Sequence, residues 1–213
     1  MKKNEIGILT VAAFLWLFAS SGARAQPTWD VGLKPGFNIA NLAGDDADSL
    51  STDSRIGFVG GVFAAVHVTD VFGVRVEGLY TQKGGTDDIS GVDITVKLDY
   101  FEFPLLAVVS VPVAENVSFD AFAGPAIAFN INSKVKGEQG GLQAEIDIDE
   151  LVKEVDFGGV VGIGWSFDTG PASILIDGRW TFGVTSFDDA DDTDVKNSAF
   201  SFTGGVAIPL GSS

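Results

Sequence analysis

The chain has 213 residues and a formal net charge of -16 at pH 7, yet 46% of its residues are hydrophobic. Disorder needs low hydrophobicity as well as high net charge, so this composition excludes a disordered acidic chain. Only 13 Lys and Arg stand against 29 Asp and Glu, which argues against a nucleic-acid partner, because phosphate contacts need clustered basic residues. Cysteine is absent, which excludes disulfides, Cys-ligated zinc and thiol nucleophiles.

The N-terminal segment has the order of a secretory signal. An apolar run at 6–19 follows two lysines and precedes Ala23-Arg24-Ala25, an A-x-A cleavage site. The alternative, a transmembrane anchor, is disfavoured because the run is shorter than the roughly 20 residues that span a bilayer. We therefore predict a signal peptide at 1–25 and a mature domain at 26–213.

Beyond this segment, apolar residues recur with period 2, the pattern of a strand whose two faces meet different environments. In the stretch 56–68, for example, the even positions include Ile56, Phe58 and Val62. The same pattern predicts eight strands, in chain order 29–40, 55–68, 73–83, 93–110, 117–132, 155–167, 172–185 and 198–209.

The connections between these strands alternate between short and long. Short turns rich in Asp, Asn, Gly or Pro follow the second, fourth and sixth strands. Longer polar segments follow the other strands and include 45–48, 134–153 and 188–194. An even strand number with this alternation is typical of outer-membrane barrels. We predict an all-β fold, an eight-stranded antiparallel up-and-down transmembrane β-barrel with short periplasmic turns and long acidic extracellular loops.

A soluble eight-stranded ligand barrel is the competing fold, because it has the same topology. The two folds differ in which face of the sheet is apolar. Here Arg75 and Glu77 alternate with Val74 and Val76, and the strand predicted at 172–185 repeats this arrangement. Charges that face a protein lumen while aliphatic residues face lipid are the membrane arrangement, which we therefore favour.

Aromatic residues near the strand ends predict two girdles at the membrane interfaces. Strands are also rich in aromatic residues for other reasons, so the pattern has a second explanation. The predicted girdles are Trp29, Phe72, Trp165 and Phe167 near the short turns, and Tyr80, Phe129, Phe157, Trp180 and Phe200 near the long loops.

The inward face of the predicted barrel carries most of the charged strand residues. Eight strands enclose a lumen only just wide enough for side chains, so these charges have to pair across it. The set predicts either a narrow ion path or, in preference, a salt-bridged plug that stabilises the barrel, with Arg75 near Glu77 and Asp177 near Arg179. The set comprises Lys34, Arg55, Arg75, Glu77, Glu102, Asp120, Asp177 and Arg179, with Asn38 and Asn130.

Other motifs give little chemistry. Carboxylates at 188–194 suit divalent cations, but no EF-hand spacing is present, so we expect a solvated loop. Loose bridging of divalent cations between this loop and anionic lipid head groups is the alternative. His67 is the only histidine, and no acid and base pair for a lipid-modifying enzyme stands out.

Gly158, Gly162 and Gly164 lack phosphate-loop spacing and instead make room for long inward neighbours. We expect no catalysis, no cofactor and no metal site.

Four short motifs follow one another along the predicted mature chain: GLKPGFN at 32–38, EGLYTQKG at 77–84, LDYFEFPL at 98–105 and AGP at 123–125. Together they resemble the motifs of the outer-membrane beta-barrel domain family of porin-like, PorT-type proteins. The resemblance implies a barrel in the outer membrane of a bacterium with two membranes. We expect a monomer among outer-membrane lipids, with a structural, surface-interaction or weak channel role. A lipid-modifying enzyme and a surface binding module that uses the acidic loops are the alternatives.

Overall fold

The computed structural model describes residues 27–43, 53–89, 92–139, 142–149, 152–184 and 196–210. The predicted signal peptide and the acidic segments 45–48 and 188–194 lie outside these residues. Within them, no helix has the length and hydropathy needed to cross a bilayer. The strands are β1 Thr28–Ala43, β2 Asp53–His67, β3 Phe72–Ile89, β4 Val92–Ala114, β5 Val117–Gln139, β6 Leu142–Asp147, β7 Val155–Asp168, β8 Ser173–Gly183 and β9 Lys196–Leu210.

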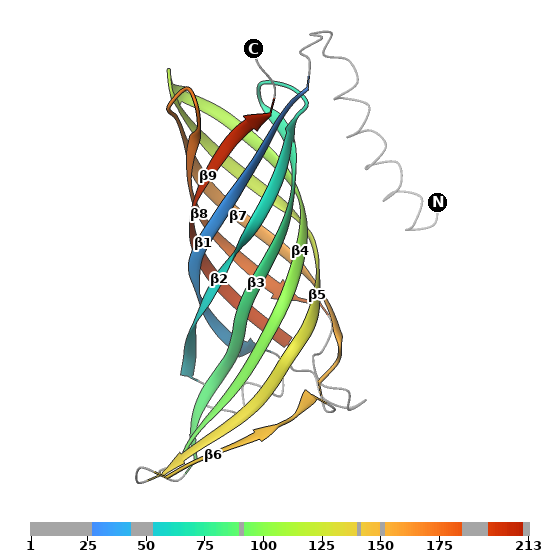
Figure 1. Cartoon of the computed structure of the whole chain (residues 1–213), viewed down its shortest axis with the longest axis vertical. Coiled ribbons are helices and arrows are strands. Elements are labelled where there is room, and N and C mark those ends of the chain that lie inside the picture. The colour runs from blue at the N-terminus through green and yellow to red at the C-terminus, as the bar shows by residue number, and fades with distance from the viewer. Residues whose placement is uncertain are drawn as a thin grey trace, which may run out of the picture.

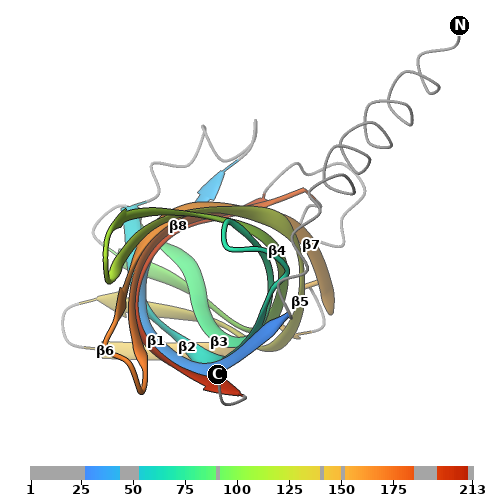
Figure 2. The same ribbon diagram turned by 90° about the horizontal axis from the view of Figure 1, so that it is seen from above.

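The strands form a closed antiparallel barrel (Figures 1 and 2). Each strand pairs with the next along the chain, except that β6 pairs only with β5, and β5 also pairs with β7. Closure comes from β1, which pairs with β2 on one side and with β9 on the other, so that Trp29 lies opposite both Val66 and Leu210. The eight-stranded barrel predicted from the sequence is confirmed, and β6 is a ninth strand that lies outside it.

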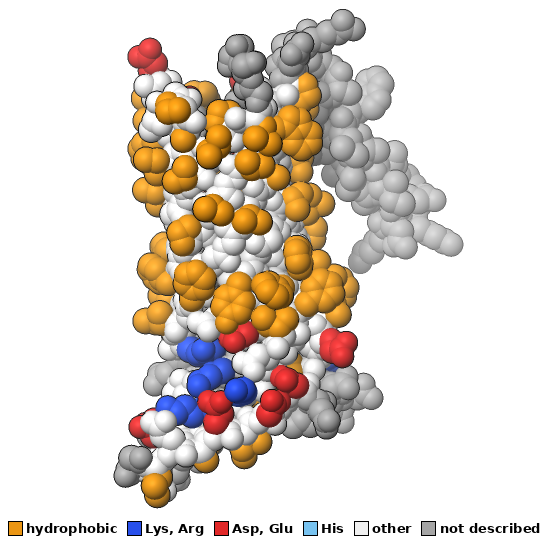
Figure 3. All heavy atoms as spheres, in the orientation of Figure 1, with side chains coloured by type: hydrophobic (Ala, Val, Ile, Leu, Met, Phe, Trp, Pro, Cys, Tyr) orange, Lys and Arg blue, Asp and Glu red, His pale blue; other side chains and the backbone are white. Residues whose placement is uncertain are grey.

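The two faces of the wall differ as the alternation predicted. On β8, Ile174, Ile176 and Trp180 are exposed, whereas Asp177 and Arg179 are buried. Aliphatic and aromatic side chains cover the barrel in a belt, and charged side chains gather beyond its lower edge (Figure 3). An apolar outer band around a polar interior is the arrangement of a barrel in lipid.

Aromatic rings mark the lower edge of this belt, at the end of the long connections. Tyr80 and Phe101 pack edge to face with their centroids 6.1 Å apart, and Trp180 stacks on Phe200 at 6.1 Å. Phe103 and Phe129 make a similar edge contact at 6.0 Å. Neighbouring strands therefore each contribute a ring at this level, as an interfacial girdle requires.

Three strands run beyond the belt, which the sequence analysis did not predict. β3, β4 and β5 continue past the barrel wall, and β5 turns into β6 to form a projecting hairpin (Figure 1). The prediction of a loop at 134–153 is therefore wrong for residues 134–139 and 142–147. The two strands of the hairpin pair along a ladder that runs from Lys134 opposite Asp147 to Gln139 opposite Leu142. This pairing satisfies the hydrogen-bonding capacity of their backbone N–H and C=O groups beyond the belt.

An extra residue in β5 separates this hairpin from the barrel. The register with β4 shifts between Asp99 and Tyr100, which lie opposite Asn132 and Asn130, so Ile131 has no opposite residue. A bulge of this kind reverses which residues face inward. Before it, Ala126 and Ala128 are buried, and after it Ser133 is buried.

Candidate functional site: a charged cluster in the lumen

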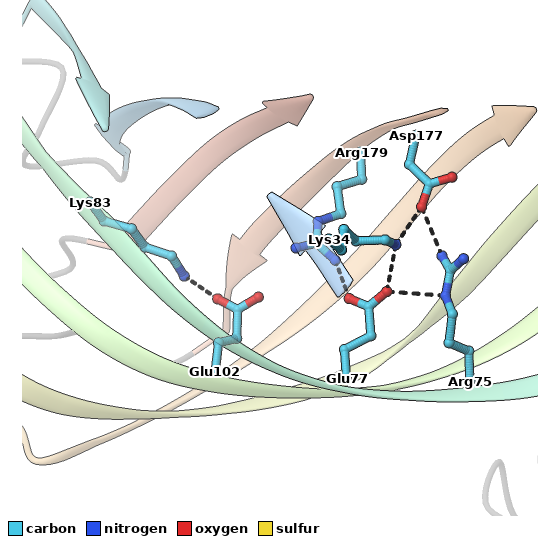
Figure 4. Close-up of polar contacts among 7 residues, drawn as sticks. All are labelled: Lys34, Arg75, Glu77, Lys83, Glu102, Asp177 and Arg179. Carbon is cyan, nitrogen blue, oxygen red and sulfur yellow. Dashed lines mark hydrogen bonds and ion pairs between the residues drawn. The ribbon is translucent and has the colours of Figure 1, made fainter. Parts of the chain in front are cut away.

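Five charged side chains meet in the middle of the lumen (Figure 4). Lys34 comes from β1, Arg75 and Glu77 from β3, and Asp177 and Arg179 from β8, and each is at most 4% exposed. In the barrel order, β3 and β8 are four strands apart and so lie on opposite walls. The cluster therefore spans the lumen from wall to wall.

Lys34 is the bridge between the two walls. Its Nζ lies 2.8 Å from Glu77 Oε1 on one side and 2.5 Å from Asp177 Oδ2 on the other. Arg75 also contacts both carboxylates, with Nε 3.0 Å from Glu77 Oε1 and Nη2 3.2 Å from Asp177 Oδ2. Charge-assisted contacts of this kind are strong and directional, so they hold the side chains across the lumen.

Arg179 does not pair with its predicted partner. Its Nη1 donates to Glu77 Oε2 on the opposite wall, whereas Asp177 is in contact with Lys34 and Arg75. Arg75 and Glu77 do lie in contact, as the sequence analysis expected. The cluster contains three cations and two carboxylates, so it carries one excess positive charge.

Aromatic rings fill the space beside these charges. Lys34 Nζ is 5.5 Å from the centroid of Phe63, and the Arg75 guanidinium is 4.6 Å from that of Phe122. Phe122 also packs with Leu106 among the buried apolar residues of the lumen. Cations over ring faces gain electrostatic attraction in a desolvated interior, so the rings both stabilise the cations and close the gaps.

A second ion pair lies toward the long-loop end. Lys83 Nζ is 2.6 Å from Glu102 Oε2 and 5.4 Å from the centroid of Tyr100, which places Glu102 outside the main cluster (Figure 4). Lys83 was not among the predicted inward residues, although its odd position puts it on the same strand face as Arg75 and Glu77. A hollow of about 10 Å³ beside Lys83 and Glu102 has room for about one water molecule.

The other predicted inward residues lie apart from the cluster. Asp120 Oδ2 accepts a hydrogen bond from Ser166 Oγ near the short turns. Asn38, at 0% exposure, donates to Thr81 Oγ1 at 2.9 Å. The last two predicted residues, Asn130 and Arg55, also have hydrogen-bond partners. Ser133 Oγ donates to Asn130 Oδ1 at 2.8 Å, and Arg55 Nη1 donates to the Lys83 carbonyl oxygen.

Two inward glycines on β7 make room for these long side chains. A Cβ built at Gly162 would lie 2.5 Å from the Phe122 ring and 2.7 Å from Arg179 Cβ. At Gly164 it would lie 2.2 Å from Asp177 Oδ1. The absence of a side chain at both positions therefore allows the Asp177 and Arg179 side chains to occupy the lumen.

The described residues contain no group of three or more His, Asp or Glu side chains placed to hold a metal ion. The one described histidine, His67, lies with Nε2 2.7 Å from Asp30 Oδ2 at the short-turn end.

Comparison with known proteins places the chain in a family. A family model described as an outer membrane protein beta-barrel domain matches residues 23–189. The chain belongs to this family. This outer membrane barrel domain protein is accordingly located in the outer membrane of a bacterium, as the sequence predicted. The narrower PorT-type resemblance stays a prediction.

Comparison with solved structures gives matches at low sequence identity. Neisserial surface protein A has a TM-score of 0.50 at 14% identity, with 86% of this chain and 99% of that chain covered. Ail of Yersinia pestis, solved with the heparin analogue sucrose octasulfate, has a TM-score of 0.43 at 15% identity, covering 84% and 99%. OprG of Pseudomonas aeruginosa has a TM-score of 0.42 at 11% identity, covering 86% and 96%. A search of curated proteins found no match.

Proposed function

We propose that this protein is a closed outer-membrane barrel with a structural or surface-interaction role, which conducts small ions weakly at most. The observation that carries the proposal is the contact of Lys34 with Glu77 on one wall and with Asp177 on the opposite wall. Moving either carboxylate away would leave a buried charge without its partner, which is costly. A solute of sugar size would have to break this cluster to pass.

The proposed orientation follows the general pattern of such barrels. We assign the short turns between β2 and β3, β4 and β5, and β7 and β8 to the periplasm, and the long connections to the outside. The projecting β5–β6 hairpin would then be an extracellular surface. All six residues of β6 are exposed, which supports a surface-interaction role.

A vesicle experiment tests the closed lumen. In reconstituted liposomes we expect negligible sugar permeation and, in planar bilayers, small ion conductance at most. Arg179→Ala should change any current, because it opens space in the lumen and removes the excess positive charge of the cluster. Lys136→Ala, a cation on the hairpin outside the lumen, serves as the control and should leave the current unchanged. Sugar flux through the wild-type protein at the rates of general porins would overturn the proposal.

We further propose that the protein has no enzymatic activity, that it is a monomer among outer-membrane lipids, and that divalent cations bind its acidic loops only loosely. Against a lipid-modifying enzyme, His67 has a carboxylate partner in Asp30 but, within the residues that the structure describes, no hydroxyl hydrogen-bonded to it. Nucleophilic catalysis needs a nucleophile within reach of its base. Assay of phospholipid and lipid A turnover by the purified protein tests this, and turnover above that of an empty-vesicle control would contradict it.

A further inference from the structure

A cavity of about 640 Å³ opens at the short-turn end of the lumen, and we call it the turn-end vestibule. Its floor includes Arg75 of the charged cluster and Phe63, and its walls come from most strands of the barrel. The volume lies within the range of small-molecule sites, roughly 300 to 1,000 Å³. The role proposed above for the cluster does not use this space.

One arc of the wall, from β4, β5 and β7, is polar. Asp120, Ser110, Ser118 and Ser166 all line the vestibule there, and Ser110 and Asp120 are cross-strand neighbours. On the other side, Leu175 of β8, Ala207 of β9 and Phe63 of β2 pack into one buried apolar cluster, which we call the apolar arc. Thr28 and Asp30 of the intervening β1 also line this side. The vestibule is therefore amphipathic across its width.

Asp120 is a buried carboxylate of the vestibule wall that has a hydrogen-bond partner for only one of its two oxygens. It is 3% exposed, and its Oδ2 accepts a hydrogen bond from Ser166, while Oδ1 has no hydrogen-bond partner among the described residues. No described Lys, Arg or His approaches this carboxylate as an ion pair. A buried carboxylate in this condition favours any ligand that supplies a charged donor.

The vestibule carries more negative than positive side chains. Asp70, Glu115 and Asp168 line its rim, and the two cationic groups on its wall are already engaged. Arg75 contacts Glu77 and Asp177, and His67 contacts Asp30. The net charge of the vestibule is therefore negative. A recess with net negative charge attracts cations, so the vestibule is suited to a cationic ligand.

We propose that the turn-end vestibule binds an alkylammonium group, with the ammonium beside the Asp120 carboxylate and the alkyl body against Phe63, Leu175 and Ala207. An ammonium donates three hydrogen bonds, which the Asp120 carboxylate and the neighbouring serine hydroxyls accept. A bare metal ion does not use the apolar arc, and three clustered metal-ligating side chains do not occur in the described part of the chain. The group comes from a free amine or from a lysine side chain of another protein.

The test is a titration of the folded protein in lipid nanodiscs. Methyl chemical shifts of Leu175 and Ala207 are followed against n-butylammonium chloride, with n-butanol as the neutral analogue of the same length. We expect saturable shifts with butylammonium and a dissociation constant at least about tenfold weaker for butanol. Equal binding of the two probes, or no saturable shift with butylammonium, would overturn the proposal.

Variants separate the two halves of the site. Asp120→Asn should weaken butylammonium at least about tenfold, whereas Asp147→Asn on β6 makes the same charge change outside the vestibule and should have no effect. Leu175→Ala should weaken butylammonium but not methylammonium, which has no alkyl body to pack. Unboiled gel migration first confirms that each variant is folded. Unchanged affinity in both vestibule variants would overturn the proposal.

Two further probes identify the source of the group. Potassium or magnesium chloride that displaces butylammonium at equal concentration would indicate an inorganic cation site and so contradict the proposal. A blocked lysine, N-acetyl-lysine methylamide, that binds more tightly than butylammonium would support a lysine side chain of a partner protein. Weaker binding of this probe would support a free amine. These outcomes do not depend on ion conductance, so the site can be present whether or not the lumen conducts.

Discussion

Glu77 has the largest number of cationic contacts in the lumen. Its two oxygens contact Lys34, Arg75 and Arg179. Glu77→Gln leaves three cations with one carboxylate, and we expect a loss of about 3 to 5 kcal/mol in the free energy of unfolding, because buried charges without partners are costly. Urea-induced unfolding in lipid vesicles, followed by tryptophan fluorescence, measures this loss.

Lys34→Met is the matched comparison for that variant. It leaves two cations and two carboxylates, so the remaining charges balance, and we expect it to cost less than Glu77→Gln. A larger cost for Lys34→Met would contradict this ranking and would mean that the geometry of the bridge matters more than the charge balance.

A charge on the lipid face should behave differently from one on the hairpin. Ile176 and Ile146 are both outward and 54% and 65% exposed, but only Ile176 lies in the belt. Ile176→Arg should cost about 2 to 4 kcal/mol if it lies near the bilayer midplane, because an arginine there is poorly solvated. Ile146→Arg should cost almost nothing. Equal costs in vesicle unfolding would mean that the outer face is assigned wrongly.

At the scale of the strand, β7 depends on its inward glycines. Gly162→Ala would place a methyl group against the Phe122 ring and Arg179, and overpacking of this kind costs about 1 to 3 kcal/mol. Gly204→Ala on β9 is the control, because a Cβ there meets nothing within 4 Å. The same unfolding assay compares them, and an equal loss would show that the lumen adapts easily.

The projecting hairpin should loosen in acid. Hydrogen bonds from Lys134 and Lys97 to the Glu145 carboxylate lower the pKa of Glu145 from its ordinary value of 4.5. The ionised form is therefore favoured in the folded hairpin, so its contribution is present above that value and is lost as the pH falls through the lower pKa. The protection factors of the β6 amides, which correct for the intrinsic pH dependence of exchange, should fall there. Glu145→Gln should reduce this pH dependence, while β8 stays protected in both proteins.

The strands of the barrel were predictable because lipid and lumen impose opposite side-chain types on neighbouring residues. This constraint ends at the belt, and β6 was missed although Leu142, Ala144 and Ile146 alternate there with polar residues, because the segment was assigned to a long polar connection. The inward set was predictable for the same reason as the strands. Which residues touch was not, because the contact of Arg179 with Glu77 depends on how far strands on opposite walls are staggered.

For the molecule as a whole, every strand of the barrel has a neighbour on both sides. A closed sheet leaves no free backbone edge in lipid, so it resists detergent until it is heated. We expect the folded protein to migrate differently on a denaturing gel before and after boiling, and its circular dichroism to be dominated by strand. Identical migration of the two samples would contradict a closed barrel.

The pairing of β1 with β9 has a consequence for biogenesis. The first and last strands of the barrel are partners, so the wall closes only once nearly the whole chain has been translated and exported. Contacts between residues so distant in sequence form slowly, and until they form, β1 and the most recent strand are open edges prone to aggregation. We therefore expect the chain to stay unfolded until β9 is available to pair with β1 and close the wall.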